Sequence, residues 1–241
     1  MRLRALAPAA LAAIASIAAA PSAHAQAPPQ GPVRLSNERT FTRWASAVTR
    51  AKAHAKPSAH ARRVGRLRFL TEDGFPEVYL LLESRSDARG ATWVRLRLPQ
   101  RPNNVTGWVR RGSLGPLHLI HTRLVVSRAR LRVTLYDHGR RRFTAPVGMG
   151  KPGTPTPSGH FWIREKFHVH GNALYGPRAM GTAAYSNVLT DWPGGGVIGL
   201  HGTNEPSLIP GRPSHGCVRL HNRDIRRLYT LTPIGTPLAI R

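Results

Sequence analysis

LHGTNEPSLIPGRPSHGCVRLHN occupies residues 200–222 of the 241-residue chain. It holds the only cysteine, Cys217, and two nearby histidines, His201 and His215. Glycines and small hydroxyl residues surround these three side chains. A thiol, a proton acceptor and a backbone able to turn tightly are what a covalent acyl-transfer site needs. The rest of the chain is therefore interpreted as a scaffold that brings this stretch to a substrate.

Gly216 allows the backbone to turn just before Cys217, so that successive N–H groups could point at one oxygen. The N–H groups of Gly216 and Cys217 are therefore the candidates for an oxyanion hole. The spacing of the residues does not decide which histidine is the general base. His215 would share a face with the thiol in an extended segment, whereas His201 ends an apolar run that could pair alongside.

The first 25 residues have the pattern of a secretory signal peptide. Arg2 and Arg4 precede an apolar, alanine-rich run, and Ala23-His24-Ala25 fits a cleavage site. We expect cleavage rather than anchoring, and we expect no other segment to span a membrane. In an exported protein a single cysteine cannot form an internal disulfide, which favours a reactive thiol over a buried, inert one.

The formal net charge is +25, and only four of the 36 basic residues are lysines. Such a surplus attracts polyanions. For an exported protein, anionic cell-wall polymers are nearer partners than nucleic acid, because the arginines are neither clustered in one helix nor interleaved with aromatic residues. An arginine-rich surface with no ligand is the alternative.

The chain reads as mostly β, in two parts. Residues 26–40 are rich in proline and glycine and are predicted to be a linker. Residues 41–116 contain short apolar runs between turns, which predicts a small β-barrel that could bind the cell wall. Residues 122–241 form a second β unit with one short helix, residues 222–231, for which Asn222 is the predicted N-cap. Residues 165–190 look irregular and are a candidate lid or substrate wall.

Two separated motifs resemble the YkuD family of L,D-transpeptidases. Ile198-x-x-His201-Gly-Thr and Ser214-His-Gly-Cys-Val-Arg-Leu-His-Asn222 look like the family signature, and Gly150…Thr156-Pro-Ser-Gly159-His-Phe161 is similar to its earlier segment. The resemblance covers residues 122–241. The 41–116 region carries a Gly107-Trp108-Val109 strand similar to bacterial Src-homology-three-like domains.

The resemblance implies a β-sandwich catalytic domain, a peptidoglycan substrate, no cofactor and no metal. It implies that Cys217 attacks a stem peptide at the L-centre of its diamino acid, releases the terminal D-residue and transfers the acyl group to an amine of another stem. His201 is then the proton donor and acceptor, and His215 assists. The implied substrate-binding residues are Ser214, Arg219, Gly202, Thr203, Asn222 and Tyr185.

The predicted function is thus cell wall biogenesis in the cell wall or periplasmic space, with effects on cell shape. Two alternatives stay open: an L,D-carboxypeptidase that releases the same acyl group to water, and a non-catalytic cell-wall-binding protein. Arg219 could equally form a structural salt bridge. His168 and His170 are the closest histidine pair, but they lack the carboxylate partners typical of a metal site.

Overall fold

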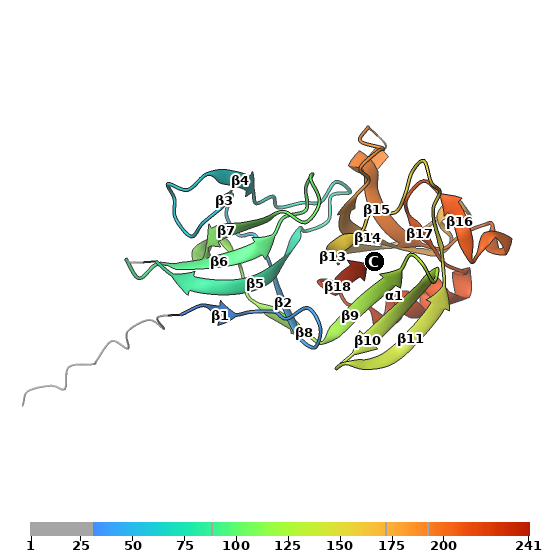
Figure 1. The fold of residues 1–241 in the computed structure, drawn as a ribbon, viewed down its shortest axis with the longest axis horizontal. Helices are drawn as coiled ribbons and strands as arrows, with labels where there is room; N and C mark the ends of the chain where they lie inside the picture. The colour runs from blue at the N-terminus through green and yellow to red at the C-terminus, as the bar shows by residue number, and fades with distance from the viewer. Residues whose placement is uncertain (1–30, 88, 172, 192) are drawn as a thin grey trace, which may run out of the picture.

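Two β-sheets and one α-helix make up the described chain (Figure 1). The computed structural model describes residues 31–241 except residues 88, 172 and 192. The predicted mostly β class is confirmed. The predicted signal peptide and the first residues of the predicted linker lie outside the described residues.

The N-terminal sheet has the strand order β4-β3-β7-β6-β5-β2-β8, with β1 paired to β5. The bounds are β1 Val33–Arg34, β2 Thr42–Ser46, β3 Lys52–His54, β4 Arg63–Arg66, β5 Val78–Ser86, β6 Thr92–Arg97, β7 Thr106–Arg110 and β8 His118–Ile120, and the 3-10 turn η1 is Arg111–Ser113. Neighbouring strands are antiparallel, as short sequential strands joined by tight turns tend to be. The likeness to a Src-homology-three-like domain stays a prediction.

The side chains of β6, the central strand of this sheet, alternate between its two faces. Val94 and Leu96, two residues apart, are buried in the N-terminal core, while Arg95 and Arg97 lie on the opposite face. Trp93 is buried as well, and its indole N–H donates to Asp87 at 2.9 Å.

Part of the predicted linker, residues 26–40, is built into the N-terminal sheet. β1 pairs with β5, and Leu35 is buried in the N-terminal core. The Ser36 hydroxyl accepts a hydrogen bond from the backbone N–H of Arg43 at 2.8 Å. The proline-rich composition concealed an apolar side chain and a backbone segment that complete the sheet.

The C-terminal sheet has the strand order β11-β10-β9-β18-β13-β14-β15-β17-β12-β16. The bounds are β9 Thr122–Ser127, β10 Arg132–Asp137, β11 Arg140–Pro146, β12 Gly148–Gly150, β13 Gly159–His168, β14 Arg178–Tyr185, β15 Val197–His201, β16 Gly211–Ser214, β17 Val218–Arg219 and β18 Pro237–Ile240, with 3-10 turns η2 Ala173–Tyr175, η3 Pro193–Gly196 and η4 Pro206–Leu208. β9 with β18, β15 with β17, and β12 with β16 are the parallel pairs.

The single described α-helix, α1 (Asn222–Leu231), has the predicted bounds. Ile225 and Leu228 bury one face against the C-terminal core. The N-cap prediction is wrong: His221 occupies that position without a side-chain cap, and Asn222 begins the helix. Among the described residues, no helix has the length and apolar character needed to cross a bilayer.

The predicted irregular region, residues 165–190, is partly strand. β13 continues to His168, and β14 fills residues 178–185 as its antiparallel neighbour. Glycines interrupt the sequence pattern there, but Gly181 pairs with Glu165 inside the ladder. Irregular backbone remains only between the strands.

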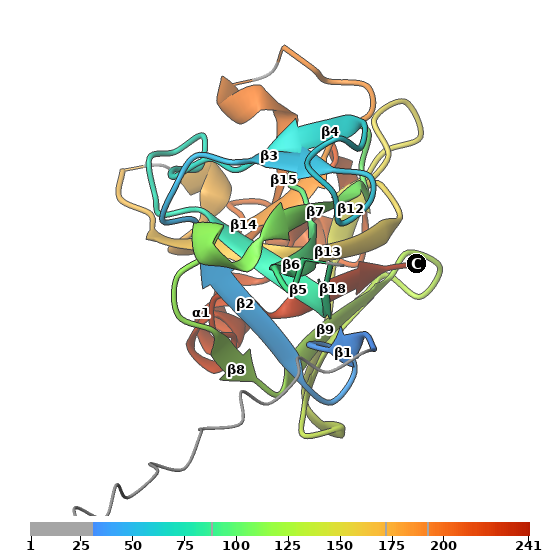
Figure 2. The ribbon, with the colours of Figure 1, turned by 90° about the vertical axis from the view of Figure 1, so that its left-hand side faces the viewer.

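The two sheets share a hydrophobic core. In Figure 2 the N-terminal strands lie in front of the C-terminal strands. Val78 and Leu80 of β5 belong to the same buried cluster as Phe161 and Trp162 of β13. The indole N–H of Trp162 donates to the backbone carbonyl of Val78 at 2.8 Å. Removing the N-terminal sheet would therefore expose apolar core.

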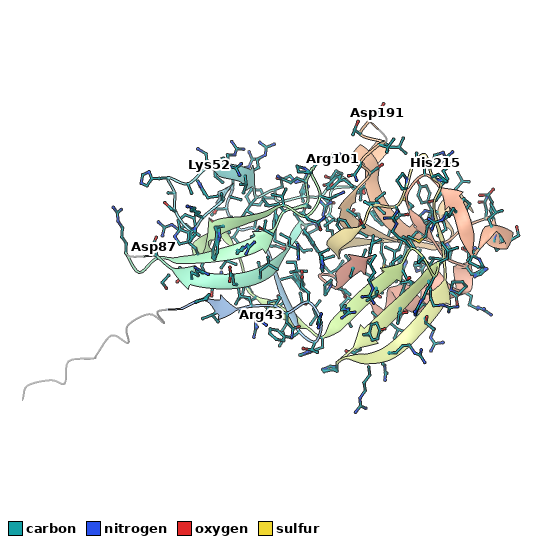
Figure 3. The ribbon with its side chains drawn as sticks, viewed as in Figure 1. Arg43, Lys52, Asp87, Arg101, Asp191 and His215 are labelled. Carbon is teal, nitrogen blue, oxygen red and sulfur yellow. The ribbon has the colours of Figure 1, made fainter. Side chains whose placement is uncertain are left out.

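A buried ionic network reinforces the same junction. Arg164 of β13 has a fully buried side chain, and its guanidinium donates to Glu77 and Glu72 of the N-terminal part. Arg101, which Figure 3 labels between the two parts, donates to the backbone carbonyls of Ser186 at 3.0 Å and Gly195 at 2.9 Å. Charged groups removed from water require such complete pairing, so the two parts are held in one arrangement.

Candidate active site

The register of β15 and β17 brings the two ends of the decisive stretch together. These strands are parallel neighbours, with Leu200 opposite Val218 and His201 opposite Arg219. Cys217 immediately precedes β17, and its partly buried thiol accepts a hydrogen bond from the Gly199 N–H of β15 at 3.4 Å. The strand that ends at His201 therefore pairs alongside the segment that carries Cys217, as predicted from the sequence.

Ser214 fixes the turn that carries the thiol. Its hydroxyl donates to the Cys217 carbonyl at 2.6 Å and accepts from the Gly216 N–H at 3.1 Å. The Thr156 hydroxyl donates to the Gly216 carbonyl at 2.7 Å. Gly216 adopts φ 130°, which side chains other than glycine rarely tolerate.

The prediction that the Gly216 N–H lies in an oxyanion hole is wrong, because that N–H is bound to the Ser214 hydroxyl. A hydroxyl two residues earlier is a local acceptor that the glycine-based argument overlooked. The backbone N–H of Cys217 remains the candidate donor. Ser214 is buried and positions the turn, and it also lines the cavity described below.

His201 is arranged as a neutral base. Its Nδ1 lies 2.6 Å from the Gly202 carbonyl oxygen. A carbonyl can only accept, so Nδ1 carries the proton and Nε2 is the basic nitrogen. Burial, with a smaller contribution from the positive charge of Arg219, lowers the pKa of His201 to about 4. The imidazole is therefore uncharged at neutral pH.

Burial likewise raises the pKa of the Cys217 thiol, against the opposing effects of the Gly199 N–H and the Arg219 charge. Both shifts favour the uncharged forms of the pair. The site is thus suited to a thiol that loses its proton to imidazole during attack, rather than to a resting thiolate–imidazolium ion pair.

A cavity of about 800 Å³ opens beside this pair. Five of the predicted site residues line it: His201, Ser214, His215, Cys217 and Arg219. Other wall residues come from β13, β14 and the segments between strands, among them Glu165, Phe167, Tyr175, Gly181 and Ile198. A cavity of this volume can hold a drug-sized ligand or a short peptide segment.

His215 and Arg219 lie on the same wall with different surroundings. His215 is solvent-exposed, and Figure 3 labels it among the C-terminal strands. Arg219 donates to Glu205 at 2.7 Å, so the structural salt bridge named as its alternative is present. The buried Nε of Arg219 has no hydrogen-bond partner among the described residues. Arg219 therefore retains a donor at the cavity wall.

Four predicted substrate-binding residues lie outside the cavity lining. The Asn222 side-chain oxygen accepts from the Thr203 N–H at 2.9 Å, and the Thr203 hydroxyl accepts from the Glu205 N–H at 3.0 Å. These contacts, together with the close approach of Gly202 to Asn222, shape the loop after β15. The motif residues here support His201 rather than face the cavity.

The fourth of these residues, Tyr185, serves the junction between the two parts. It is buried, and its hydroxyl donates to Glu72 at 2.6 Å while the Arg68 and Arg164 guanidinium groups donate to it. The interpretation of Tyr185 as a substrate-binding residue is therefore wrong. The other tyrosine of that region, Tyr175, is the one that reaches the site.

Tyr175 was missed as a site residue. Its ring lies 4.7 Å from the His201 ring, measured between centroids, at an angle of 55°. Burial, followed by the charge of Cys217, raises the pKa of the Tyr175 hydroxyl. The only sequence signal was its position in the predicted lid, a signal that it shared with Tyr185.

No group of three or more histidine, cysteine or acidic side chains suited to a metal ion occurs among residues 31–241, gaps excepted. His168 lines the cavity and packs edge-on against the Tyr229 ring at 5.6 Å.

Comparison with known proteins identifies the family of the C-terminal part. Residues 121–240 match the family model of the L,D-transpeptidase catalytic domain, YkuD. The putative L,D-transpeptidase YkuD of Bacillus licheniformis is 36% identical over 118 residues, which cover 49% of this chain and 64% of the relative. The probable L,D-transpeptidase YbiS of Escherichia coli K12 is 29% identical over 135 residues, covering 48% and 44%.

Among solved structures, an L,D-transpeptidase from Mycobacterium tuberculosis H37Rv is 16% identical and covers 63% of this chain and 90% of its own, with a TM-score of 0.42. The chain spans less than two thirds of the curated relatives it matches. Residues 121–240 belong to the YkuD family of L,D-transpeptidase catalytic domains.

Proposed function

We propose that the chain is an exported peptidoglycan L,D-transpeptidase that acts in the cell wall or periplasmic space and contributes to cell wall biogenesis and cell shape. One observation carries the proposal: the basic Nε2 of a neutral His201 and the thiol of Cys217 belong to adjacent strand ends on the wall of one cavity. Family membership of residues 121–240 supplies the substrate class.

In the proposed acylation step, the Cys217 sulfur bonds to the carbonyl carbon that follows the L-centre of a stem diamino acid. The thiol proton passes to Nε2 of His201, and the Cys217 N–H donates to the developing oxyanion. The C–N bond to the terminal D-residue then breaks. His201 returns its proton to the leaving amine, which leaves a thioester on Cys217.

In the proposed transfer step, an amine of another stem attacks the thioester. His201 takes the proton from the attacking nitrogen, and the thiolate that leaves regains a proton from the imidazolium. The products are a cross-linked stem and the starting enzyme. Water in place of the amine would give the L,D-carboxypeptidase reaction. His215 and Arg219 are proposed to contact the stem peptide, with Arg219 near a substrate carboxylate.

Product analysis of defined stem peptides tests this function. Wild-type protein and Cys217→Ala are incubated with a tetrapeptide stem, with and without a tripeptide acceptor, and products are weighed by mass spectrometry. The proposal predicts a cross-linked dimer from the wild type alone. Tripeptide and free D-residue, with acceptor present, would favour the carboxypeptidase. No turnover by a protein that still pellets with sacculi would favour a non-catalytic wall-binding protein.

A further inference from the structure

The cavity beside Cys217 has an acidic wall in a strongly basic chain. Glu165 of β13 and Asp73, from the turn before β5, both line it, although the chain has only 11 acidic residues against 36 basic ones. Asp73 also acts electrostatically on Tyr175 and on Glu165. The two carboxylates therefore face the same space as the ring that packs on His201.

Glu165 is a buried carboxylate with an unused oxygen. Glu165 is 1% exposed, and one of its carboxylate oxygens accepts a hydrogen bond from the Thr71 hydroxyl. The other, Oε1, is buried without a hydrogen-bond partner among the described residues. A Cβ placed on Gly181 would collide with Oε1, and Gly181 itself lines the cavity. Glycine at position 181 thus leaves room for Oε1, and both residues line the cavity.

Neither neighbouring cation donates a hydrogen bond to this oxygen. Arg164 points to the opposite face of β13, where it binds Glu77 and Glu72. The Lys166 ammonium donates to the backbone carbonyls of Tyr229 at 2.6 Å and Thr232 at 2.9 Å. A buried carboxylate oxygen without a donor is costly, so the arrangement suits a donor that arrives with a ligand.

We propose that Glu165, aided by Asp73, binds the primary ammonium group of a stem-peptide diamino acid. This rests on the proposed function and deepens it by assigning a residue to the recognition of the amine. An ammonium has three N–H donors, and one of them would satisfy Oε1. The amine could belong to the donor stem or to the acceptor stem. Both sources present the same group to the same wall.

The protonation of Glu165 is consistent with this role. Burial raises the pKa of Glu165 to about 7, against the opposing effects of the Thr71 hydroxyl and the Arg164 charge. A bound ammonium would favour the charged carboxylate and lower that pKa. Proton release on binding would then accompany recognition of the amine near neutral pH.

The N-terminal part supplies one of the two acidic residues of this wall, Asp73. Thr71 and Asp73 lie on one turn, and Phe75 of that turn packs edge-on against Phe167 of β13 with the ring centroids 4.9 Å apart. The catalytic family match begins only at residue 121. The N-terminal part is therefore inferred to shape amine recognition as well as to stabilise the fold.

The donor arm of the test compares tetrapeptide stems with a free or an acetylated side-chain amine, made with L-lysine and with meso-diaminopimelate. Intact mass gives the acylation rate of Cys217 without acceptor. The acceptor arm forms the acyl-enzyme from the acetylated donor and measures transfer to a tripeptide amine at low concentration. Wild type, Glu165→Gln, Asp73→Asn and the control Asp137→Asn, a partly exposed carboxylate on β10 that is remote from the cavity lining, are compared.

A lost charge-assisted contact predicts that Glu165→Gln reduces the rate with the free amine about tenfold or more in one arm, and Asp73→Asn by less. The arm affected identifies the donor or the acceptor as the source. Alkylation of Cys217 by iodoacetamide should stay as in the wild type, since it needs no amine.

Rates within twofold of the wild type in both arms for both acidic variants would overturn the assignment. Asp73 lies on an exposed turn, so Asp73→Asn gives a result even if Glu165→Gln folds poorly. A wild-type protein that forms no acyl-enzyme with any donor would refute the proposed function instead, together with this inference.

Discussion

At the scale of single residues, the reactivity of the site follows from two opposite departures from ordinary pKa values. The pKa of the Cys217 thiol is raised by burial, and that of His201 is lowered to about 4. A thiol with a raised pKa and an imidazole with a lowered pKa are both uncharged near pH 7. In the proposed mechanism, proton transfer therefore accompanies attack on the carbonyl, and a neutral resting thiol is less prone to oxidation than a thiolate.

The pH dependence of iodoacetamide alkylation tests that neutral pair. We expect the alkylation rate of Cys217 to rise only above about pH 8.5, the ordinary pKa of a cysteine thiol. Mass spectrometry of the alkylated protein gives the rate. A plateau between pH 5 and 7 would reveal a thiolate stabilised by imidazolium and would contradict the neutral pair.

The acid limit of acylation provides a second check. His201 must be neutral to accept a proton, and its pKa is lowered to about 4, so acylation should persist as the pH falls and fail only near that value. The second-order acylation rate from pH 3.5 to 8, measured with a donor whose side-chain amine is acetylated so that protonation of Glu165 does not contribute, tests this. Loss of activity around the usual histidine pKa, about 6.5, would show that the active base is less buried than His201.

Ser214 should matter for the turn more than its small size suggests. Ser214→Ala leaves the Gly216 N–H and the Cys217 carbonyl without their partner. An unsatisfied buried group costs about 1–3 kcal/mol, so we expect a comparable loss in unfolding free energy and a much slower acylation. Ser207→Ala, at an exposed residue in η4, is the control. Equal behaviour of the two variants would remove Ser214 from the site.

At the scale of elements, Asn222 links α1 to the loop that follows β15. Asn222→Ala should lower the urea-unfolding free energy by about 1–2 kcal/mol, because the Thr203 N–H loses its acceptor. Asn222→Asp keeps an acceptor oxygen and should lose less. A change in substrate KM with no change in unfolding free energy would instead indicate that Asn222 binds the substrate.

Strands and helices were predicted correctly where the pattern of neighbouring residues alone determines them. The strand predicted at Gly107-Trp108-Val109 lies in β7, and the helix predicted over residues 222–231 is α1. The pattern of β14 was missed because glycines and small residues interrupt it, yet Gly181 is needed to make room for Glu165. A glycine that is needed because of a residue distant in the sequence weakens the local strand pattern. The neighbouring residues in the sequence do not show why it is there.

The same reasoning explains the mixed outcome for the site. Cys217, Ser214 and His201 occur within one motif, so the sequence places them together. Tyr175 and Glu165 reach the cavity from other strands and turns, and no spacing rule connects them to the motif. Tyr185 was chosen instead because two tyrosines in one region look alike until the packing is known.

At the scale of the whole molecule, the two parts are one structural unit rather than an enzyme with a detachable module. Replacing Arg164 with Met should remove the fully buried partner of Glu77 and leave that carboxylate only the less buried Arg68, at a cost of about 3–5 kcal/mol. Adding Glu77→Gln should recover much of it. Urea unfolding, followed by tryptophan fluorescence, measures both. A cost below about 1 kcal/mol for the single variant would mean that the junction tolerates charge.

The basic surface of the N-terminal part is the candidate contact for anionic cell-wall polymers. Arg50, Lys52, Arg63 and Arg66 line a groove of about 550 Å³ that also exposes Phe69. Neutralising Arg63 and Arg66 to Gln should weaken pelleting with sacculi, most strongly at low salt. The control must carry the same net charge.

That control neutralises Arg140 and Arg141, two exposed residues of β11 on the C-terminal part. Equal losses for the two pairs would mean that net charge alone governs binding. A loss confined to the groove variant would support a defined polymer site. Composition and motif spacing do not show which distant segments lie together. The sequence therefore predicted a basic surface but not its position in the fold.

The measurement that tests the central claim most directly is the intact mass of the protein after brief exposure to a tetrapeptide stem. We predict a wild-type adduct whose mass equals that of the stem minus that of the free D-amino acid released, located on Cys217 by peptide mapping, and no adduct on Cys217→Ala. Cross-linking by the wild type without such an adduct, or an equal adduct on Cys217→Ala, would contradict it.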